Sequence, residues 1–464
     1  MFIGREYELS ELEKLYKKST FQFAIIYGRR RVGKTRIIQE FIKNKKAIFF
    51  SAIESTSRRN LDQLSKTIYS TIMPKRKTLP AFASYEDALE AVCEYASEEK
   101  IIFVIDEYPY LAASERSISS ILQNMIDHHF SKTNALIILC GSSMSFMENQ
   151  VLGYQSPLYG RRTGQFLIKP FDYYTSSLFV KNYLPEEKAI VFGITGGIPK
   201  YLELIDDSLT LKENIIALFL KNNAYLFEEP GNLLKQELRE PAYYNAIIEA
   251  IAGGSSKLNE IATATQMDTA TVSTYMKSLS SLNIVKKEVA ITEEKNRKKT
   301  IYKLEDTMFA FWYKYVIPNM FLIQAGESEY LYDEKIYPTI NDFMGHIFED
   351  MCKQYLQKIN LSNQLPFKLL QLGKWWGTAP KKRKEAEIDI VGINELEKKA
   401  LFGECKFRNE KLGKSVLESL YNKAELFQQY EHKYYVLFSK TGFSDDICRL
   451  KDEKVMCVEL ENMY

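Results

Sequence analysis

Cysteine is scarce in this chain of 464 residues, and none of its six cysteines forms a Cys-x-x-Cys pair. Neither a disulfide framework nor a zinc module is therefore expected, and a reducing, cytoplasmic location fits best. No run of 18 apolar residues occurs, so we expect no membrane span and no membrane partner. Basic and acidic side chains number 62 and 60, which excludes a uniformly basic nucleic-acid coat but not local basic patches.

The composition is otherwise typical of a globular protein, with 45% hydrophobic and 26% charged residues. A chain of this length has room for roughly three domains of about 150 residues each. Short apolar runs alternate with helical stretches over residues 1–230; the runs are 23–27, 47–50, 101–105 and 136–140. Strands that are apolar on both faces predict a parallel sheet inside a three-layer αβα domain. We interpret residues 172–230, which are mostly helical in pattern, as a lid of that domain.

A phosphate-binding motif follows the first apolar run. Residues 28–35 fit GxxxxGK[ST] between a predicted strand and a predicted helix. The two glycines let backbone N–H groups curl around phosphate oxygens, and the helix N-terminus adds partial positive charge. Lys34 is expected to reach the β- and γ-phosphates of ATP, and the Thr35 hydroxyl to ligate Mg²⁺. The expected ATP contacts of this segment are Gly28, Arg29, Arg30, Arg31, Val32, Gly33, Lys34, Thr35 and Arg36.

Polar residues at the ends of later runs complete the predicted ATP site. Asp106 and Glu107 follow the run 101–105, where Asp106 would hold the water shell of Mg²⁺ and Glu107 would polarise the attacking water. Ser142 follows the run 136–140 and is placed to sense the γ-phosphate. Arg161 is a candidate for stabilising transition-state charge, within one copy or from a neighbouring subunit. The alternative is that Arg161 and Arg162 are a surface arginine pair.

Residues 231–320 change character. Helical patterns at 258–262 and 269–282 surround a short turn, and residues 284–303 read as two strands with a charged tip at 293–299. This order predicts a winged helix-turn-helix. Its second helix carries no arginine and one lysine before Leu279, so contact with DNA and contact with a protein partner both remain open.

Residues 321–464 contain a second predicted chemical site. Asp389 lies on one apolar strand, and Glu404 and Lys406 share one face of the next. Two carboxylates on neighbouring strands can share Mg²⁺, and the lysine can orient a hydrolytic water. Glu349, on a helix upstream, is a candidate for a further metal ligand. The basic loop 381–384 beside two tryptophans would suit a phosphate backbone, or is a solvated loop.

The chain resembles the archaeal-type P-loop ATPases related to the AAA+ and STAND groups, which also occur in bacteria. The motifs that carry the resemblance are residues 2–9, 28–35, 106–107, 159–161 and 196–201. The resemblance implies that the opening segment lies near the adenine, with Gly4 and Arg5 as its contacts. It also implies an ATPase, a winged helix and a C-terminal nuclease-like domain in that order.

The second chemical site resembles the PD-(D/E)XK superfamily of restriction-endonuclease-like nucleases. By that resemblance Asp389, Glu404 and Lys406 are the catalytic set and Glu349 is the auxiliary acid. The chain departs from the name-giving motif because Glu387-Ile388 stand where a Pro-Asp pairing is often seen.

Together these patterns predict an α/β multidomain protein. Its parts are a P-loop ATPase at 1–230, a winged helix with connector at 231–320 and a nuclease-like domain at 321–464. We expect ATP and Mg²⁺ as cofactors, DNA as the partner, and an architecture compatible with a homo-oligomer. The predicted function is ATP hydrolysis that gates a Mg²⁺-dependent nuclease site acting on nucleic acid. The alternatives are an ATP-dependent DNA-binding switch with a non-cutting scaffold, and recruitment of a protein by the winged helix.

Overall fold

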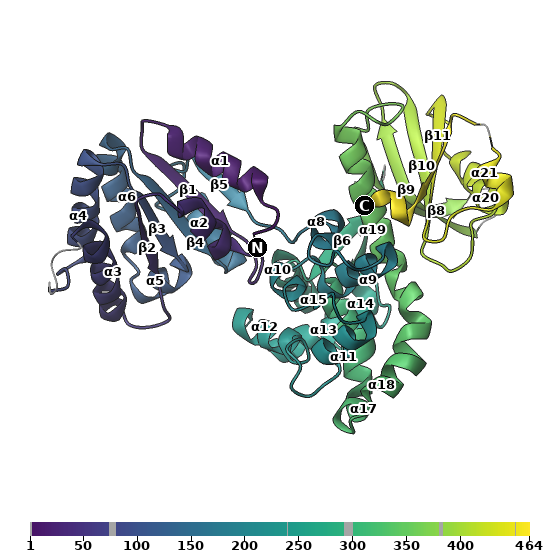
Figure 1. The fold of residues 1–464 in the computed structure, drawn as a ribbon, viewed down its shortest axis with the longest axis horizontal. Coiled ribbons are helices and arrows are strands. Elements are labelled where there is room, and N and C mark those ends of the chain that lie inside the picture. Colours follow the sequence, from purple (N-terminus) through teal and green to yellow (C-terminus); the bar gives the residue numbers. More distant parts are fainter. Residues whose placement is uncertain (1, 74–79, 239, 292–299, 380–383, 451) are drawn as a thin grey trace. The chain divides into compact units, whose positions relative to one another are not determined.

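The computed structural model describes residues 2–73, 80–238, 240–291, 300–379, 384–450 and 452–464. The chain divides into two units, Met1–Pro170 and Phe171–Tyr464 (Figure 1). The helical segment 172–230, interpreted above as a lid of the ATPase, belongs to the second of these units. Two predicted basic segments, 293–299 and 381–383, lie outside the described residues.

The first unit is built on a five-stranded parallel sheet with the order β2-β3-β4-β1-β5. Its strands are β1 (Gln22–Tyr27), β2 (Ala47–Ser51), β3 (Ile102–Asp106), β4 (Leu136–Gly141) and β5 (Gly164–Leu167). The four apolar runs coincide with the first four strands, and the parallel sheet is confirmed. The sequence does not predict the fifth strand, because this strand is short and one of its four residues is buried. Since all five strands run the same way, their carboxyl ends share one edge.

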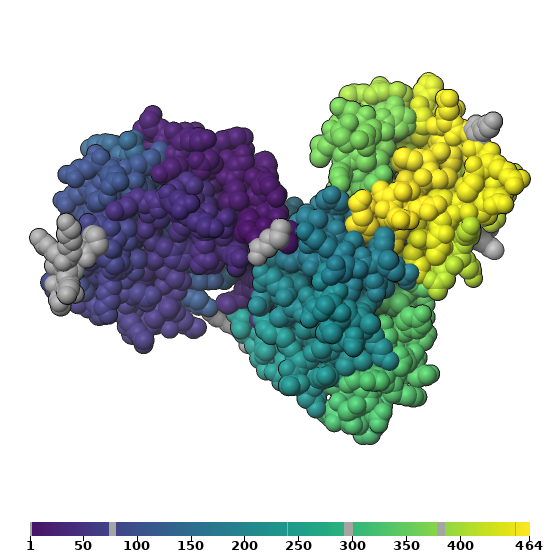
Figure 2. Space-filling view, in the orientation of Figure 1, coloured from purple at the N-terminus to yellow at the C-terminus, as the bar shows by residue number. Residues whose placement is uncertain are grey.

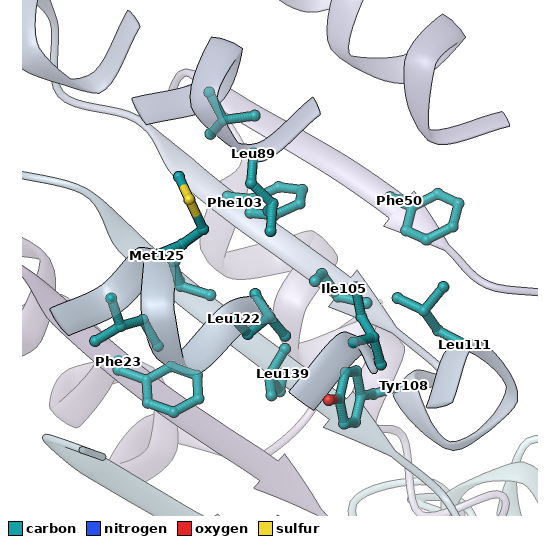
Figure 3. Close-up of a cluster of buried hydrophobic side chains, with 14 of the residues drawn as sticks. Phe23, Phe50, Leu89, Phe103, Ile105, Tyr108, Leu111, Leu122, Met125 and Leu139 are labelled. Atoms are coloured by element: carbon teal, nitrogen blue, oxygen red, sulfur yellow. The ribbon is translucent and has the colours of Figure 1, made fainter. Parts of the chain in front are cut away.

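Helices cover both faces of this sheet. They are α1 (Glu6–Lys17), α2 (Lys34–Ile42), α3 (Ser57–Ile72), α4 (Tyr85–Glu98), α5 (Tyr108–Ser114) and α6 (Ile118–His128). Figure 3 shows one face, where Phe23, Phe103 and Leu139 of the strands pack with Leu89 of α4 and Leu122 of α6. The alternate residues of the same strands are buried as well, as the two-sided apolar pattern requires.

Short helices open the second unit. They are α8 (Tyr173–Ser177), α9 (Pro185–Thr195), α10 (Pro199–Leu202), α11 (Leu211–Phe219) and α12 (Glu229–Glu237). Helix α8 is tied to the other end of the unit, since the Tyr173 hydroxyl donates to the Met463 carbonyl at 2.8 Å and its ring lies edge-on to Tyr464. In Figure 2 the blue-teal surface of this segment meets the yellow surface of the C-terminal residues. The first helix of this unit thus packs against its last residues.

Three helices and an antiparallel ribbon follow. They are α13 (Pro241–Ala252), α14 (Leu258–Thr265), α15 (Thr269–Ser281), β6 (Val285–Val289) and β7 (Thr300–Leu304). Asp268 caps α15 by accepting from the N–H groups of Ala270 and Thr271. Ile261 of α14 and Val272 of α15 are fully buried, as the apolar spacing predicts.

An aromatic connector and a long helix lead into a second sheet. The connector begins with α16 (Thr307–Phe311), and α19 (Ile340–Leu361) follows it. The sheet has the order β12-β11-β10-β9-β8, antiparallel from β8 to β10 and parallel from β10 to β12. Its elements are β8 (Gln371–Ala379), β9 (Lys384–Asn394), β10 (Lys399–Lys406), α20 (Lys414–Ala424), β11 (His432–Ser439), α21 (Asp445–Cys448) and β12 (Val455–Glu459).

An ionic network joins the β6–β7 ribbon to α19. The Asp350 carboxylate of α19 lies 3.0 Å from Lys286 and 4.0 Å from Lys303 of the ribbon, and 3.3 Å from Lys353 one turn on. Burial alone would raise the pKa of Asp350, but the three ammonium groups outweigh it and hold that pKa well below its usual range. Lys286 and Lys303 of the ribbon are therefore engaged within the chain.

Asp350→Asn is expected to lower the free energy of unfolding of the second unit by about 1 kcal/mol at pH 7, since water screens a side chain that is 34% exposed. A lowered folded-state pKa contributes stability above the unfolded value, and that contribution is lost as the pH falls through the folded pKa. The difference from wild type should therefore shrink below about pH 4. Urea unfolding of the full chain measures it, because all three tryptophans (Trp312, Trp375 and Trp376) lie in the second unit. Asp333→Asn, which removes a surface pair with Lys212, is the control and should change little.

Candidate nucleotide site and carboxylate cluster

The phosphate-binding motif forms a tight loop between β1 and α2. Gly28 has no room for a side chain, because a Cβ there would meet the Ile168 carbonyl oxygen at 2.4 Å. Gly33, with φ of 90°, adopts the left-handed conformation and starts α2. Lys34 is buried and donates to the carbonyls of Gly28 and Arg29 at 2.9 Å each. Its burial lowers the pKa of the ammonium group.

The acidic pair meets this loop at the carboxyl edge of the sheet. The Thr35 hydroxyl of α2 donates to Asp106 Oδ2 at 3.0 Å, although β4 lies between β3, which ends at Asp106, and β1, which precedes the loop. Glu107 follows in the left-handed conformation, which turns its side chain towards β4. There the Ser142 hydroxyl donates to Glu107 Oε2 at 2.8 Å. The structure thus brings Lys34, Thr35, Asp106, Glu107 and Ser142 together.

The opening segment packs against the same loop. Gly4 and Arg5 are consecutive left-handed residues before α1. The Arg5 guanidinium donates to the carbonyls of Val32 at 3.2 Å and Lys169 at 2.6 Å. The remaining predicted ATP contacts differ in their surroundings. Arg29 and Val32 are buried, and Arg36 is exposed on α2. The Arg30 guanidinium donates to the Tyr110 hydroxyl, and the backbone of Arg31 is left-handed.

Arg161 is not brought to this site. Its guanidinium forms two hydrogen bonds of 2.7 and 2.6 Å with the Asp127 carboxylate at the end of α6. It precedes β5, whose first residue Gly164 pairs with Ala24 near the start of β1. Arg161 therefore lies at the edge where the strands begin, opposite the phosphate-binding loop.

A second cluster forms where α19, β8, β9 and β10 meet. Asp389 of β9 and Glu404 of β10 are buried, and Asp389 Oδ2 accepts from the Cys405 N–H at 3.0 Å. Lys406 Nζ lies 2.7 Å from Glu404 Oε1 and 3.6 Å from Asp389 Oδ2. The structure therefore unites the three residues that the strand pattern predicts, and Lys423 of α20 donates to the other oxygen of Glu404 at 3.0 Å.

Glu349 of α19 reaches the same cluster. One carboxylate oxygen from each of Glu349, Glu387 and Asp389 lies within 4.8 Å of the other two. Oxygen ligands of this kind are what Mg²⁺ prefers, so the side chains present fit a divalent cation.

The electrostatics of the cluster reflect its crowding. Burial, together with the negative charges of Glu404 and Glu349, raises the pKa of Asp389. Burial would also raise the pKa of Glu349, but the His346 contact and the charge of Lys374 lower it to about 2. Burial lowers the pKa of Lys406, yet the charges of Asp389 and Glu404 raise it further, so that the net shift is upward. The carboxylates of the cluster thus concentrate negative charge, which Lys374, Lys406 and Lys423 partly neutralise.

Among the described residues, the sequence assigns no role to three charged side chains of this cluster: Lys374, Glu387 and Lys423. Lys374 does carry a signal, since it is a lone lysine between Gly373 and two tryptophans. Lys423 carries a weaker signal: it lies on α20 beside the buried residues Leu420 and Ala424.

Comparison with known proteins places the chain. Residues 2–205 match a family described as an ATPase domain predominantly from Archaea. An uncharacterized protein of Methanocaldococcus jannaschii is 32% identical over 445 residues, which is 95% of this chain and 96% of that protein. The chain belongs to this archaeal ATPase family. It therefore contains a P-loop ATPase domain.

Two further likenesses concern parts of this chain. An uncharacterized ATP-binding protein of the same organism is 48% identical over 46 residues, 10% of this chain and 78% of that protein. A Walker-type ATPase of Pyrococcus abyssi has 22% identity and a TM-score of 0.52, over 67% of this chain and 96% of that one. That structural likeness concerns the fold alone.

The C-terminal part of the chain matches a different family. Residues 312–418 match archaeal and bacterial proteins of unknown function.

Within the described residues, no helix is both long and apolar enough to cross a membrane.

Proposed function

We propose that this ATPase acts on DNA, and that ATP binding and hydrolysis gate a Mg²⁺-dependent nuclease site in its C-terminal part. The observation that carries the nuclease proposal is the meeting of Asp389, Glu404 and Lys406, with the ammonium group 2.7 and 3.6 Å from the two carboxylates. In the proposed organisation the ATPase occupies 1–230, a winged helix 231–320 and a restriction-endonuclease-like domain 321–464.

At the nucleotide site, Lys34 would bind the β- and γ-phosphates, while Thr35 and Asp106 would hold Mg²⁺. The bound cation would offset phosphate charge. Glu107 is assigned to polarise the attacking water, and Ser142 to report the γ-phosphate to Glu107 through their hydrogen bond. Gly4 and Arg5 are assigned to the adenine side. Arg161 would act on the nucleotide of a neighbouring copy in a homo-oligomer, since within one copy it lies at the opposite edge of the sheet.

At the carboxylate cluster, Asp389, Glu404 and Glu349 would hold Mg²⁺, which would polarise a phosphodiester. Lys406 would orient the hydrolytic water and supply positive charge beside the scissile phosphate. The element order α19-β8-β9-β10-α20-β11, with the acids on the central strands, supports the nuclease-like assignment.

DNA contact is assigned to the exposed face of α15, where Thr269, Thr274 and Lys277 are accessible. Lys286 and Lys303 are left out of this surface because both bind acids of the chain.

The test is cleavage of linear, supercoiled, single-stranded and branched DNA with Mg²⁺ or Mn²⁺, with and without ATP. Wild type, Lys34→Ala, Lys406→Ala and Lys399→Ala run side by side. Lys399→Ala is the control, because it removes an exposed lysine–glutamate pair at the far end of the same strand.

We expect Lys406→Ala to lower cleavage at least about 100-fold, as the removal of a positioned catalytic group does. Lys34→Ala should lose the response to ATP, and Lys399→Ala should cut like wild type. If wild type turns over ATP but cuts no substrate, the nuclease proposal fails and a DNA-binding switch replaces it.

A further inference from the structure

Lys374 of β8 is a buried cation at the carboxylate cluster, with 6% of its surface exposed. Its Nζ donates to Glu349 Oε2 at 2.8 Å and also pairs with Glu387. The other oxygen of Glu349 lies 3.2 Å from the ring of His346, whose side chain is largely exposed. Lys374 is therefore the buried partner of Glu349, and His346 the accessible one.

An irregularity in the sheet aims Lys374 inward. Gly373 pairs with Val391 and Trp375 with Ile388, so two residues of β9, Asp389 and Ile390, oppose the single residue Lys374. Such a β-bulge redirects side chains and occurs often beside active sites. The bulge thus lies at Asp389, and it places Lys374 opposite that acid.

The main chain of Lys374 is fixed as well. Its carbonyl accepts the Ile291 N–H at 2.8 Å, and Ile291 packs so closely that a Cβ on Gly373 would meet it at 3.3 Å. The next residue, Trp375, is anchored in a hydrophobic cluster with Ile291. A lysine held this firmly keeps its ammonium group in one place.

We infer that Lys374 is a positioning residue of the metal site, which holds the Glu349 carboxylate towards Asp389 by binding one of its oxygens. This rests on the proposed function in that the cluster takes a divalent cation. Without Lys374, the partner left to Glu349 among the described residues would be the exposed His346, and Asp389 and Glu387 would repel its carboxylate. Partners that orient metal ligands in this way are worth about 10- to 100-fold in metal affinity.

The experiment measures Mn²⁺ binding to the full chain without nucleotide, by titration followed by electron paramagnetic resonance. Binding that Asp389→Asn removes is assigned to the cluster. The variants are Lys374→Met, Lys374→Arg, Glu349→Gln and the double variant Lys374→Met/Glu349→Gln. Lys399→Met is the control, since it removes a lysine–carboxylate pair of the same sheet. Tryptophan fluorescence checks folding, and Lys374→Gln replaces Lys374→Met if the latter does not fold.

Lys374→Met is expected to weaken Mn²⁺ binding about 10- to 100-fold. Arginine keeps the charge and the donors, so Lys374→Arg should recover most of the affinity. Because Lys374 acts through Glu349, the double variant should bind no more weakly than Glu349→Gln alone. Lys399→Met should bind like wild type.

Unchanged or tighter binding by Lys374→Met would overturn the inference, as would losses that multiply in the double variant. Absence of Mn²⁺ binding in wild type would overturn it together with the proposed metal site. Absence of DNA cleavage, with Mn²⁺ bound and lost in Lys374→Met, would refute the nuclease proposal alone.

Discussion

Replacing Lys34 by alanine is expected to lower ATP hydrolysis about 100-fold or more and to weaken ATP binding. The ammonium group lies in the phosphate-binding loop, where the carbonyls of Gly28 and Arg29 hold it and burial lowers its pKa. A buried cation whose charge is costly gains most from a nearby anion, so the phosphates would supply what the carbonyls only partly provide. Phosphate release and the binding of a fluorescent ATP analogue measure the two effects.

Lys43→Ala is the matched control for Lys34→Ala. Lys43 directly follows the same helix, α2. Its side chain is 67% exposed, and its Nζ lies 3.7 Å from Glu40 Oε1. The ATP turnover of Lys43→Ala should equal that of wild type. Full turnover in Lys34→Ala would instead place hydrolysis outside the loop at residues 28–35.

Glu107→Gln is expected to retain ATP and to slow its hydrolysis by about 10²- to 10⁴-fold, the usual contribution of a positioned general base. Glutamine has the size of glutamate and can still accept the Ser142 hydrogen bond, so the loop geometry should persist. What the substitution removes is the negative charge that polarises water. Single-turnover phosphate release, measured beside equilibrium ATP binding, separates the two steps.

Glu11→Gln, which changes a carboxylate of the surface pair with Lys14 on α1, controls for the loss of one acid in the first unit. It should hydrolyse ATP normally. Equal rates for Glu107→Gln and wild type would mean that another group activates the water.

The first unit follows from the sequence because its signals are local. Each inner strand is apolar on both faces, and the loop at residues 28–35 has fixed spacing next to a strand and a helix. Strand β5 is missed because it has four residues, of which one is buried, and so carries no such pattern. Arg161 could be named from the sequence, but its partner could not, since Asp127 is 34 positions away and nothing local links the two.

The carboxylate cluster likewise contains residues that the sequence predicts and others, among them Lys374, that it does not. Asp389, Glu404 and Lys406 stand out because acids and a lysine interrupt apolar strands at a spacing of two. Lys374 does not follow from spacing, because its inward direction depends on a bulge in the neighbouring strand and on the packing of Ile291. Interactions that arise only when distant segments meet are invisible to a single-sequence pattern.

The contact between Tyr173 and Met463 also sets an order of events during synthesis. Residues 1–170 are contiguous and can fold while the rest of the chain is still being made. Helix α8 must then wait for a partner 290 positions later. At ribosomal speeds of 5–20 residues per second the wait is roughly 15 to 60 s. During that time the unit that carries the phosphate-binding loop has been synthesised, and the part that carries the carboxylate cluster is still a nascent chain.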